Sequence, residues 1–174
     1  METQNTKSGQ VLSGSQSPAQ ATNGETITIR STTAICGLCE KYVEAHRDRR
    51  YAVASCEGAC LRGEISRRAA NILCHSLASE STVRVCSGSA LTKDSGQRSL
   101  LRNASNVLIL EGCSLECASR SLEAVVPAMK KVVIQTDRLA DFDRGLFGVD
   151  ELDEAEITVI AEKVAQKVLQ TQFH

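Results

Sequence analysis

The stretch NVLILEGCSLEC, residues 106–117, sets the pattern for the rest of the chain. Its apolar run is short, continuous and rich in β-forming residues, which predicts a strand buried on both faces. Gly112 permits a sharp exit from that strand, and Ser114 is a suitable N-cap for a following helix. We therefore expect Cys113 and Cys117 at the carboxyl end of a strand and on the first turn of the next helix. Open α/β sheets hold their ligands in that position.

The same strand-to-helix pattern repeats along the chain. Strands are predicted at residues 51–55, 82–85, 107–110 and 131–135, and helices at 64–78, 97–103, after Ser114, and through 157–168. Strands that alternate with helices through short links indicate a parallel sheet covered on both faces. The predicted fold class is therefore α/β, a three-layer, mostly parallel sheet of four to five strands, flavodoxin-like or related. The simplest strand order is 2-1-3-4, with a cysteine cluster at the carboxyl end of the sheet.

The first 25 residues differ in composition from the rest of the chain. Residues 1–25 are rich in Ser, Gln, Thr, Gly and Asn, which predicts a disordered N-terminal tail. Residues 26–174 are expected to form a single domain. Within it, residues 26–30 alternate Ile and Thr and predict a short edge strand, and residues 40–50 form a charged, helical prelude.

The charge balance argues against several partners. Lys plus Arg total 20 and Asp plus Glu total 21, a net charge of −1, which gives no support for nucleic-acid or membrane-surface binding. No apolar stretch approaches the ~18 residues that cross a bilayer, and the first residues lack the pattern of a secretory signal. We therefore expect a cytoplasmic protein.

Cysteine is unusually frequent. The chain has 8: Cys36, Cys39, Cys56, Cys60, Cys74, Cys86, Cys113 and Cys117. In a reducing compartment this density indicates metal or thiol chemistry more often than disulfides. Three of these cysteines follow predicted strands and so meet at one edge of the sheet, while Cys74 lies in a predicted helix and is expected in the core.

Four thiolates are a preferred ligand set for zinc. The candidate metal ligands are Cys56, Cys60, Cys86, Cys113 and Cys117, and Cys60 competes with Cys86 for the fourth position. An iron–sulfur cluster remains open, because four thiolates suit either group. The pair Cys36 and Cys39 predicts a second metal half-site, a thiol pair or no function.

One family carries much of this pattern. The chain resembles the DGC-domain family of zinc-binding proteins in three motifs that occur in order. They are a strand followed by Cys-x-Gly, a strand followed by Cys, and a strand followed by (Asp/Glu)-Gly-Cys-x-x-x-Cys-Ala. The matching residues are Cys56, Gly58, Cys86, Gly112, Cys113, Cys117 and Ala118. The resemblance covers residues 51–136, and Glu111 stands where the family has Asp. It implies zinc as the bound metal and four shared cysteines as its ligands: Cys56, Cys86, Cys113 and Cys117.

Two other readings use the same thiols. Cys56 and Arg62, separated by five residues after a strand, resemble the phosphate loop of low-molecular-weight tyrosine phosphatases and arsenate reductases. There the loop and the Arg would bind an oxyanion and the Cys would attack as a thiolate. Gly63, however, stands where those enzymes carry Ser or Thr. Transfer of sulfur or selenium by thiols, without a metal, is the remaining alternative.

Overall fold

The computed structural model describes residues 24–30 and 32–173. The predicted tail, residues 1–25, lies almost wholly outside the described residues. The predicted edge strand at residues 26–30 is wrong: the segment has no regular structure, and Ile27 and Ile29 are exposed. Two isolated apolar side chains bury too little surface to fix a strand, and the four-stranded sheet of the described residues does not include them.

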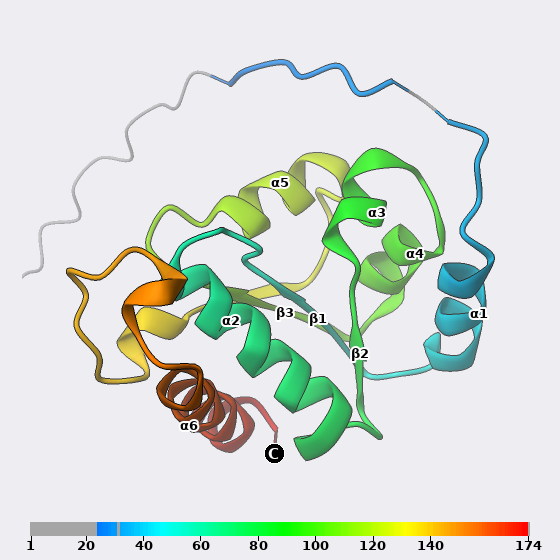
Figure 1. Cartoon of the computed structure of the whole chain (residues 1–174). Coiled ribbons are helices and arrows are strands. Elements are labelled where there is room, and N and C mark those ends of the chain that lie inside the picture. The colour runs from blue at the N-terminus through cyan, green and yellow to red at the C-terminus, as the bar shows by residue number, and fades with distance from the viewer. Residues whose placement is uncertain (1–23, 31, 174) are drawn as a thin grey trace, which may run out of the picture.

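A parallel sheet forms the middle layer of the domain (Figure 1). Its strands are β1 (Tyr51–Ser55), β2 (Thr82–Arg84), β3 (Asn106–Glu111) and β4 (Lys131–Gln135). All pairings are parallel and the order is β2-β1-β3-β4, which confirms the predicted order. Thr82 and Arg84 alternate with Val83 and Val85 in the sequence, a pattern that indicates a sheet edge, and β2 is an edge strand.

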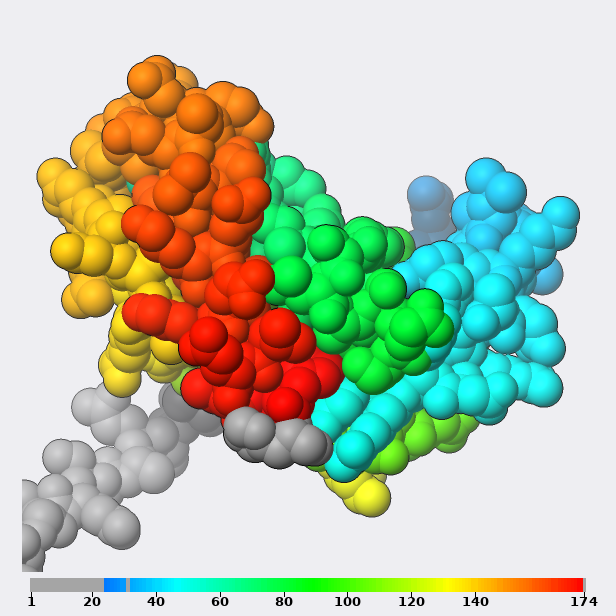
Figure 2. Space-filling view, turned by 90° about the horizontal axis from the view of Figure 1, so that it is seen from below, coloured from blue at the N-terminus to red at the C-terminus, as the bar shows by residue number. Residues whose placement is uncertain are grey.

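Helices cover both faces of the sheet. They are α1 (Gly37–His46), α2 (Leu61–Ile72), α3 (Ser87–Thr92), α4 (Gly96–Asn103), α5 (Cys117–Val125) and α6 (Glu154–Gln172). Figure 1 shows α2 and α6 on one side and α3, α4 and α5 on the other, with α1 beside α4. Figure 2 shows the outer surface where α6 lies along α2. No helix among the described residues is long and apolar enough to cross a membrane.

Two cores result from the alternation of side chains along the strands. Val53, Leu108 and Leu110 pack against α2 and α6 on one face. Their neighbours in sequence, such as Ala54 and Ile109, pack against α4 and α5 on the other. Cys74, predicted to be a core residue, lies in the first core and is 5% exposed, which confirms that prediction.

Two helix predictions needed correction. The helix after β3 begins at Cys117 and not after Ser114, because its N-cap is Glu116, which has a left-handed backbone (φ 52°, ψ 43°). The chain first makes a turn in which the Glu116 N–H donates to the Cys113 carbonyl at 3.3 Å. The other correction is helix α3, just after β2, which lies where no helix was predicted; its Ser, Gly and Thr residues favour turns in the sequence alone.

Candidate thiol site

The site lies where β1 and β3, the two central strands, end side by side. The chain leaves β1 toward α2 on one face and leaves β3 toward α5 on the other (Figure 1). This divergence opens a crevice at the carboxyl edge of the sheet, as the topological switch point of an open α/β fold does. Cys56 is the first residue after β1, and its N–H donates to the Leu110 carbonyl of β3 at 2.8 Å.

Three glycines bring the two exit loops into close contact. A methyl group added to Gly63, in the first turn of α2, would lie 2.5 Å from the Gly58 carbonyl oxygen. One added to Gly112 would lie 2.8 Å from the backbone carbon of Arg62. None of the described glycines has a positive φ, so these residues are required for close approach of backbones and not for an unusual turn.

The Cys56 sulfur faces this glycine-lined backbone. It is half-buried, and the N–H groups of Gly58 and Gly112 donate to it. Burial raises the pKa of the Cys56 thiol, and the nearby Glu111 and Cys60 raise it further, whereas the two N–H donors lower it. Cys60 shares this space: a methyl group on Gly58 would lie 3.3 Å from the Cys56 sulfur and 3.8 Å from that of Cys60.

A cavity of about 240 Å³ joins Cys56 to helix α5. Cys56 and Gly58 line one side, Ser87 at the start of α3 a second, and Cys117 and Ser121 of α5 the third. Thiols from the ends of β1 and β3 therefore open into one space. The cavity wall is mostly apolar, which favours a soft ligand over a highly hydrated one.

The remaining candidate cysteines, Cys113 and Cys86, do not line the cavity of Cys56 and Cys117. Cys113 is half-buried at the start of the turn that leads to α5. Cys86 is exposed and lines a separate pocket with Cys39. Among the described residues, no three His, Cys, Asp or Glu side chains lie close enough together to hold a metal ion. Cys56 and Cys60 both lie near Gly58, and Cys56 and Cys117 line the same cavity.

Glu111, the acidic residue of the family motif, is hydrogen-bonded to the elements on either side of the site. It is 1% exposed, and its carboxylate accepts the Ser119 N–H of α5 at 2.6 Å. A carboxylate at a helix N-terminus satisfies a free N–H and interacts favourably with the helix dipole. The Glu111 carbonyl also accepts the Thr136 hydroxyl at 3.0 Å, so this residue links β3, β4 and α5.

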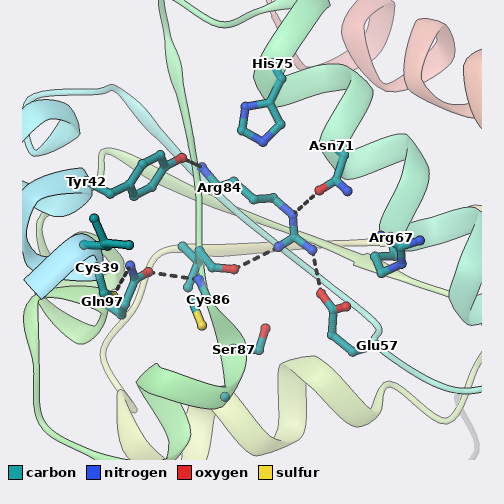
Figure 3. A pocket seen from close by; sticks show the side chains of 13 residues that line it. Cys39, Tyr42, Glu57, Arg67, Asn71, His75, Arg84, Cys86, Ser87 and Gln97 are labelled. Carbon is teal, nitrogen blue, oxygen red and sulfur yellow. Dashed lines mark hydrogen bonds and ion pairs between the residues drawn. The ribbon is translucent and has the colours of Figure 1, made fainter. Parts of the chain in front are cut away.

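A partly buried arginine fixes the other side of the loop after β1. Arg84 of β2 donates to Glu57 at 2.5 Å, and its Nε donates to Asn71 of α2 at 3.1 Å (Figure 3). It also donates to Ser55 at 2.6 Å. Only 12% of the Arg84 side chain is exposed, against 43% for Glu57. Because the guanidinium is fully partnered, Arg84 positions the loop and is not free to bind a ligand.

Arg62 does not serve the cavity. Its guanidinium donates to the Arg144 carbonyl, its Nε is buried without a partner, and Arg62 is not among the residues that line the cavity of Cys56. The Gly58 carbonyl also closes against Gly63, where a phosphate loop would carry a hydroxyl side chain. This arrangement does not support the phosphatase-like alternative.

A larger pocket, of about 650 Å³, lies beside the first site (Figure 3). Gln97 of α4 connects its two thiol residues: the Nε2 group donates to the Cys39 sulfur at 3.1 Å, and Oε1 accepts the Cys86 N–H at 2.9 Å. Gln97 is 1% exposed. Sequence reasoning missed its role, although a polar residue one turn from Leu101 on the buried face of a helix was an available signal.

The fold and this site together define a class: parallel α/β proteins that gather thiols at the carboxyl edge of the sheet. A family model for the DGC domain matches residues 52–167. The chain belongs to the DGC domain family, as its motif predicted. No curated protein and no solved structure matches the chain.

Proposed function

We propose that this protein binds a soft metal ion, zinc foremost, through thiolates at the carboxyl edge of its sheet. The observation that carries the proposal is the shared cavity of Cys56 and Cys117, which come from loops at the ends of two neighbouring strands. Two thiols that converge from separate elements, on a scaffold fixed by close glycine contacts, are half of a tetrahedral thiolate site.

The donor set suits zinc chemically. Zinc binds thiolates, and backbone N–H groups aimed at sulfur stabilise the charge that a thiolate ligand carries. Gly58 and Gly112 supply such groups to Cys56. When bound, the metal would cross-link the loops that leave β1 and β3, and with an open position it would supply Lewis acidity.

The arrangement favours Cys60 over Cys86 beside Cys56, Cys113 and Cys117. Cys60 lies with Cys56 over Gly58, whereas Cys86 lines the pocket of Cys39. A modest rearrangement of the loops must accompany binding, because no three candidate ligands among the described residues lie close enough together to hold a metal ion. The Arg84 clamp and the Glu111 cap limit how far these loops can move.

The test is zinc titration of the reduced full-length chain under anaerobic conditions, with bound metal measured after gel filtration. We expect one zinc per chain, weaker zinc binding in Cys56→Ser, Cys117→Ser and Cys60→Ser, and unchanged binding in Cys86→Ser. Cys36→Ser, at an exposed position remote from the cavity, is the matched control. Absence of stoichiometric metal, or equal loss in Cys36→Ser and Cys56→Ser, would refute the proposal.

A further inference from the structure

A second pair of cysteines opens helix α1, outside the residues that match the family. Cys36 is the N-cap of α1, and Cys39 lies in its first turn. The Glu40 N–H donates to the Cys36 carbonyl at 3.1 Å, which closes that turn. Side chains three residues apart on a helix are neighbours, so the two thiols can approach within one turn.

The two thiols have different surroundings. Cys36 is exposed, whereas Cys39 is half-buried and its sulfur accepts the Gln97 Nε2 hydrogen bond. Gln97 is itself fixed, because it is buried and accepts the Cys86 N–H (Figure 3). An accessible sulfur that can attack, three residues before a second sulfur held in place, suits thiol–disulfide exchange.

Helix α1 is firmly docked on the domain. Val43 is 7% exposed and packs so closely on Gly96 of α4 that a methyl group there would lie 2.8 Å from the valine. The Tyr42 hydroxyl accepts the Arg84 N–H at 3.0 Å, and the His46 ring stacks on Tyr42. The cysteine pair is therefore presented on a rigid element.

Apolar residues surround the pair. Ile35 and Leu38 are 70% and 79% exposed, although both are large and hydrophobic. Leu38 and Cys39 also line the pocket of about 650 Å³, whose wall is mostly apolar. Exposed apolar side chains beside a reactive group favour an apolar partner over a small, charged disulfide.

We propose that Cys36 and Cys39 form a dithiol that reduces disulfides within apolar peptide segments. The Cys36 thiolate attacks one sulfur of the substrate disulfide, forming a mixed disulfide and releasing the first substrate thiolate. Cys39 then attacks the Cys36 sulfur, which forms the Cys36–Cys39 disulfide and releases the second. The substrate gains two electrons, the pair loses two, and the two thiol protons pass to the released thiolates. A second dithiol restores the pair by the reverse exchange.

The test uses the reduced full-length protein and an apolar peptide that contains one disulfide. We expect release of peptide thiol and, by mass spectrometry of digests, a Cys36–Cys39 disulfide. Cys36→Ser loses the reaction, and Cys39→Ser stops at a mixed disulfide on Cys36. Oxidised glutathione, a small charged disulfide, reacts more slowly than the peptide. Leu38→Ser slows the peptide reaction, whereas Ile27→Ser, a change at an equally exposed apolar residue, leaves it unchanged.

Several outcomes would overturn this proposal. One is a peptide adduct that forms on Cys86 or Cys117 as readily as on Cys36 in the Cys39→Ser protein. Equal rates with glutathione and with the peptide would refute the apolar substrate. Loss of zinc from the Cys36→Ser, Cys39→Ser double variant would make the pair a metal half-site. Retained zinc with no exchange would refute the dithiol alone and leave the metal proposal standing.

Discussion

Among the glycines of the thiol site, Gly63 leaves the least space for a side chain, because the Gly58 carbonyl packs directly against it. In Gly63→Ala the new methyl group would lie 2.5 Å from that oxygen and 3.0 Å from the carbonyl carbon. Both atoms belong to the backbone, so no side chain can rotate away. The loop over residues 56–60 must shift, and with it the Gly58 N–H that donates to Cys56.

Two opposing effects set the change in the free energy of unfolding of Gly63→Ala. Overpacking of this kind costs about 1–3 kcal/mol, whereas Ala in place of Gly within a helix gains up to about 1 kcal/mol. Gly88→Ala, in the first turn of α3, gains the same propensity and meets nothing within 4 Å. The difference between the two variants therefore isolates the contact. It should be about 1–3 kcal/mol, with Tm lower by about 2–4 °C for each kcal/mol.

The assay is urea unfolding followed by circular dichroism, with the alkylation rate of native Cys56 as a local readout. We expect Gly63→Ala to unfold at lower urea than Gly88→Ala and to expose Cys56 to faster alkylation. Equal stability of the two variants, with an unchanged rate at Cys56, would refute the close-packed arrangement of the loops.

Three further predictions concern single side chains. Glu111→Gln should lower the free energy of unfolding by about 1–2 kcal/mol, because it weakens the charged cap on the Ser119 N–H; an unchanged urea midpoint would contradict this. Hydrogen bonds from Arg67 lower the pKa of Glu64 to about 2, so Glu64 stabilises the fold above its unfolded pKa of about 4.3, and that contribution disappears as the pH falls through about 2. The gap of about 1–3 kcal/mol between the parent and Glu64→Gln should therefore close between about pH 5 and pH 2; a gap that persists at pH 2 would argue against the ion pair. Burial raises the pKa of Cys74 to about 11, so this thiol should resist alkylation at pH 8 until the protein unfolds, and labelling in the native state would show otherwise.

Much of the fold could be predicted from periodicity. The strand at residues 131–135 was predicted with the bounds that β4 has, and the order of the four strands followed from the alternation of strands and helices. The start of α5 could not be predicted. Ser114 is a good N-cap in isolation, but the helix begins later, with Glu116 as its N-cap, and its Ser119 N–H donates to the Glu111 carboxylate at the end of β3.

The site could be predicted only in outline. That thiols would collect at the carboxyl edge followed from their places after the strands, and Cys56 and Cys117 do share a cavity. Which thiols face one another depends on side-chain contacts that spacing does not encode. Gln97 accepts the Cys86 N–H beside the pocket that Cys39 also lines. Arg84 donates to Glu57 and so fixes the loop that follows β1. Gly112 was predicted to permit a sharp exit from the strand, but the structure shows that its lack of a side chain admits the backbone of Arg62.

X-ray absorption at the zinc edge of the reduced, metal-loaded protein tests the central claim most directly. The account predicts one zinc per chain with a shell of four sulfur atoms at about 2.3 Å. In Cys60→Ser that shell should lose a sulfur, whereas in Cys86→Ser it should remain complete. A shell made only of nitrogen or oxygen atoms, or a protein that retains no metal, would contradict the account.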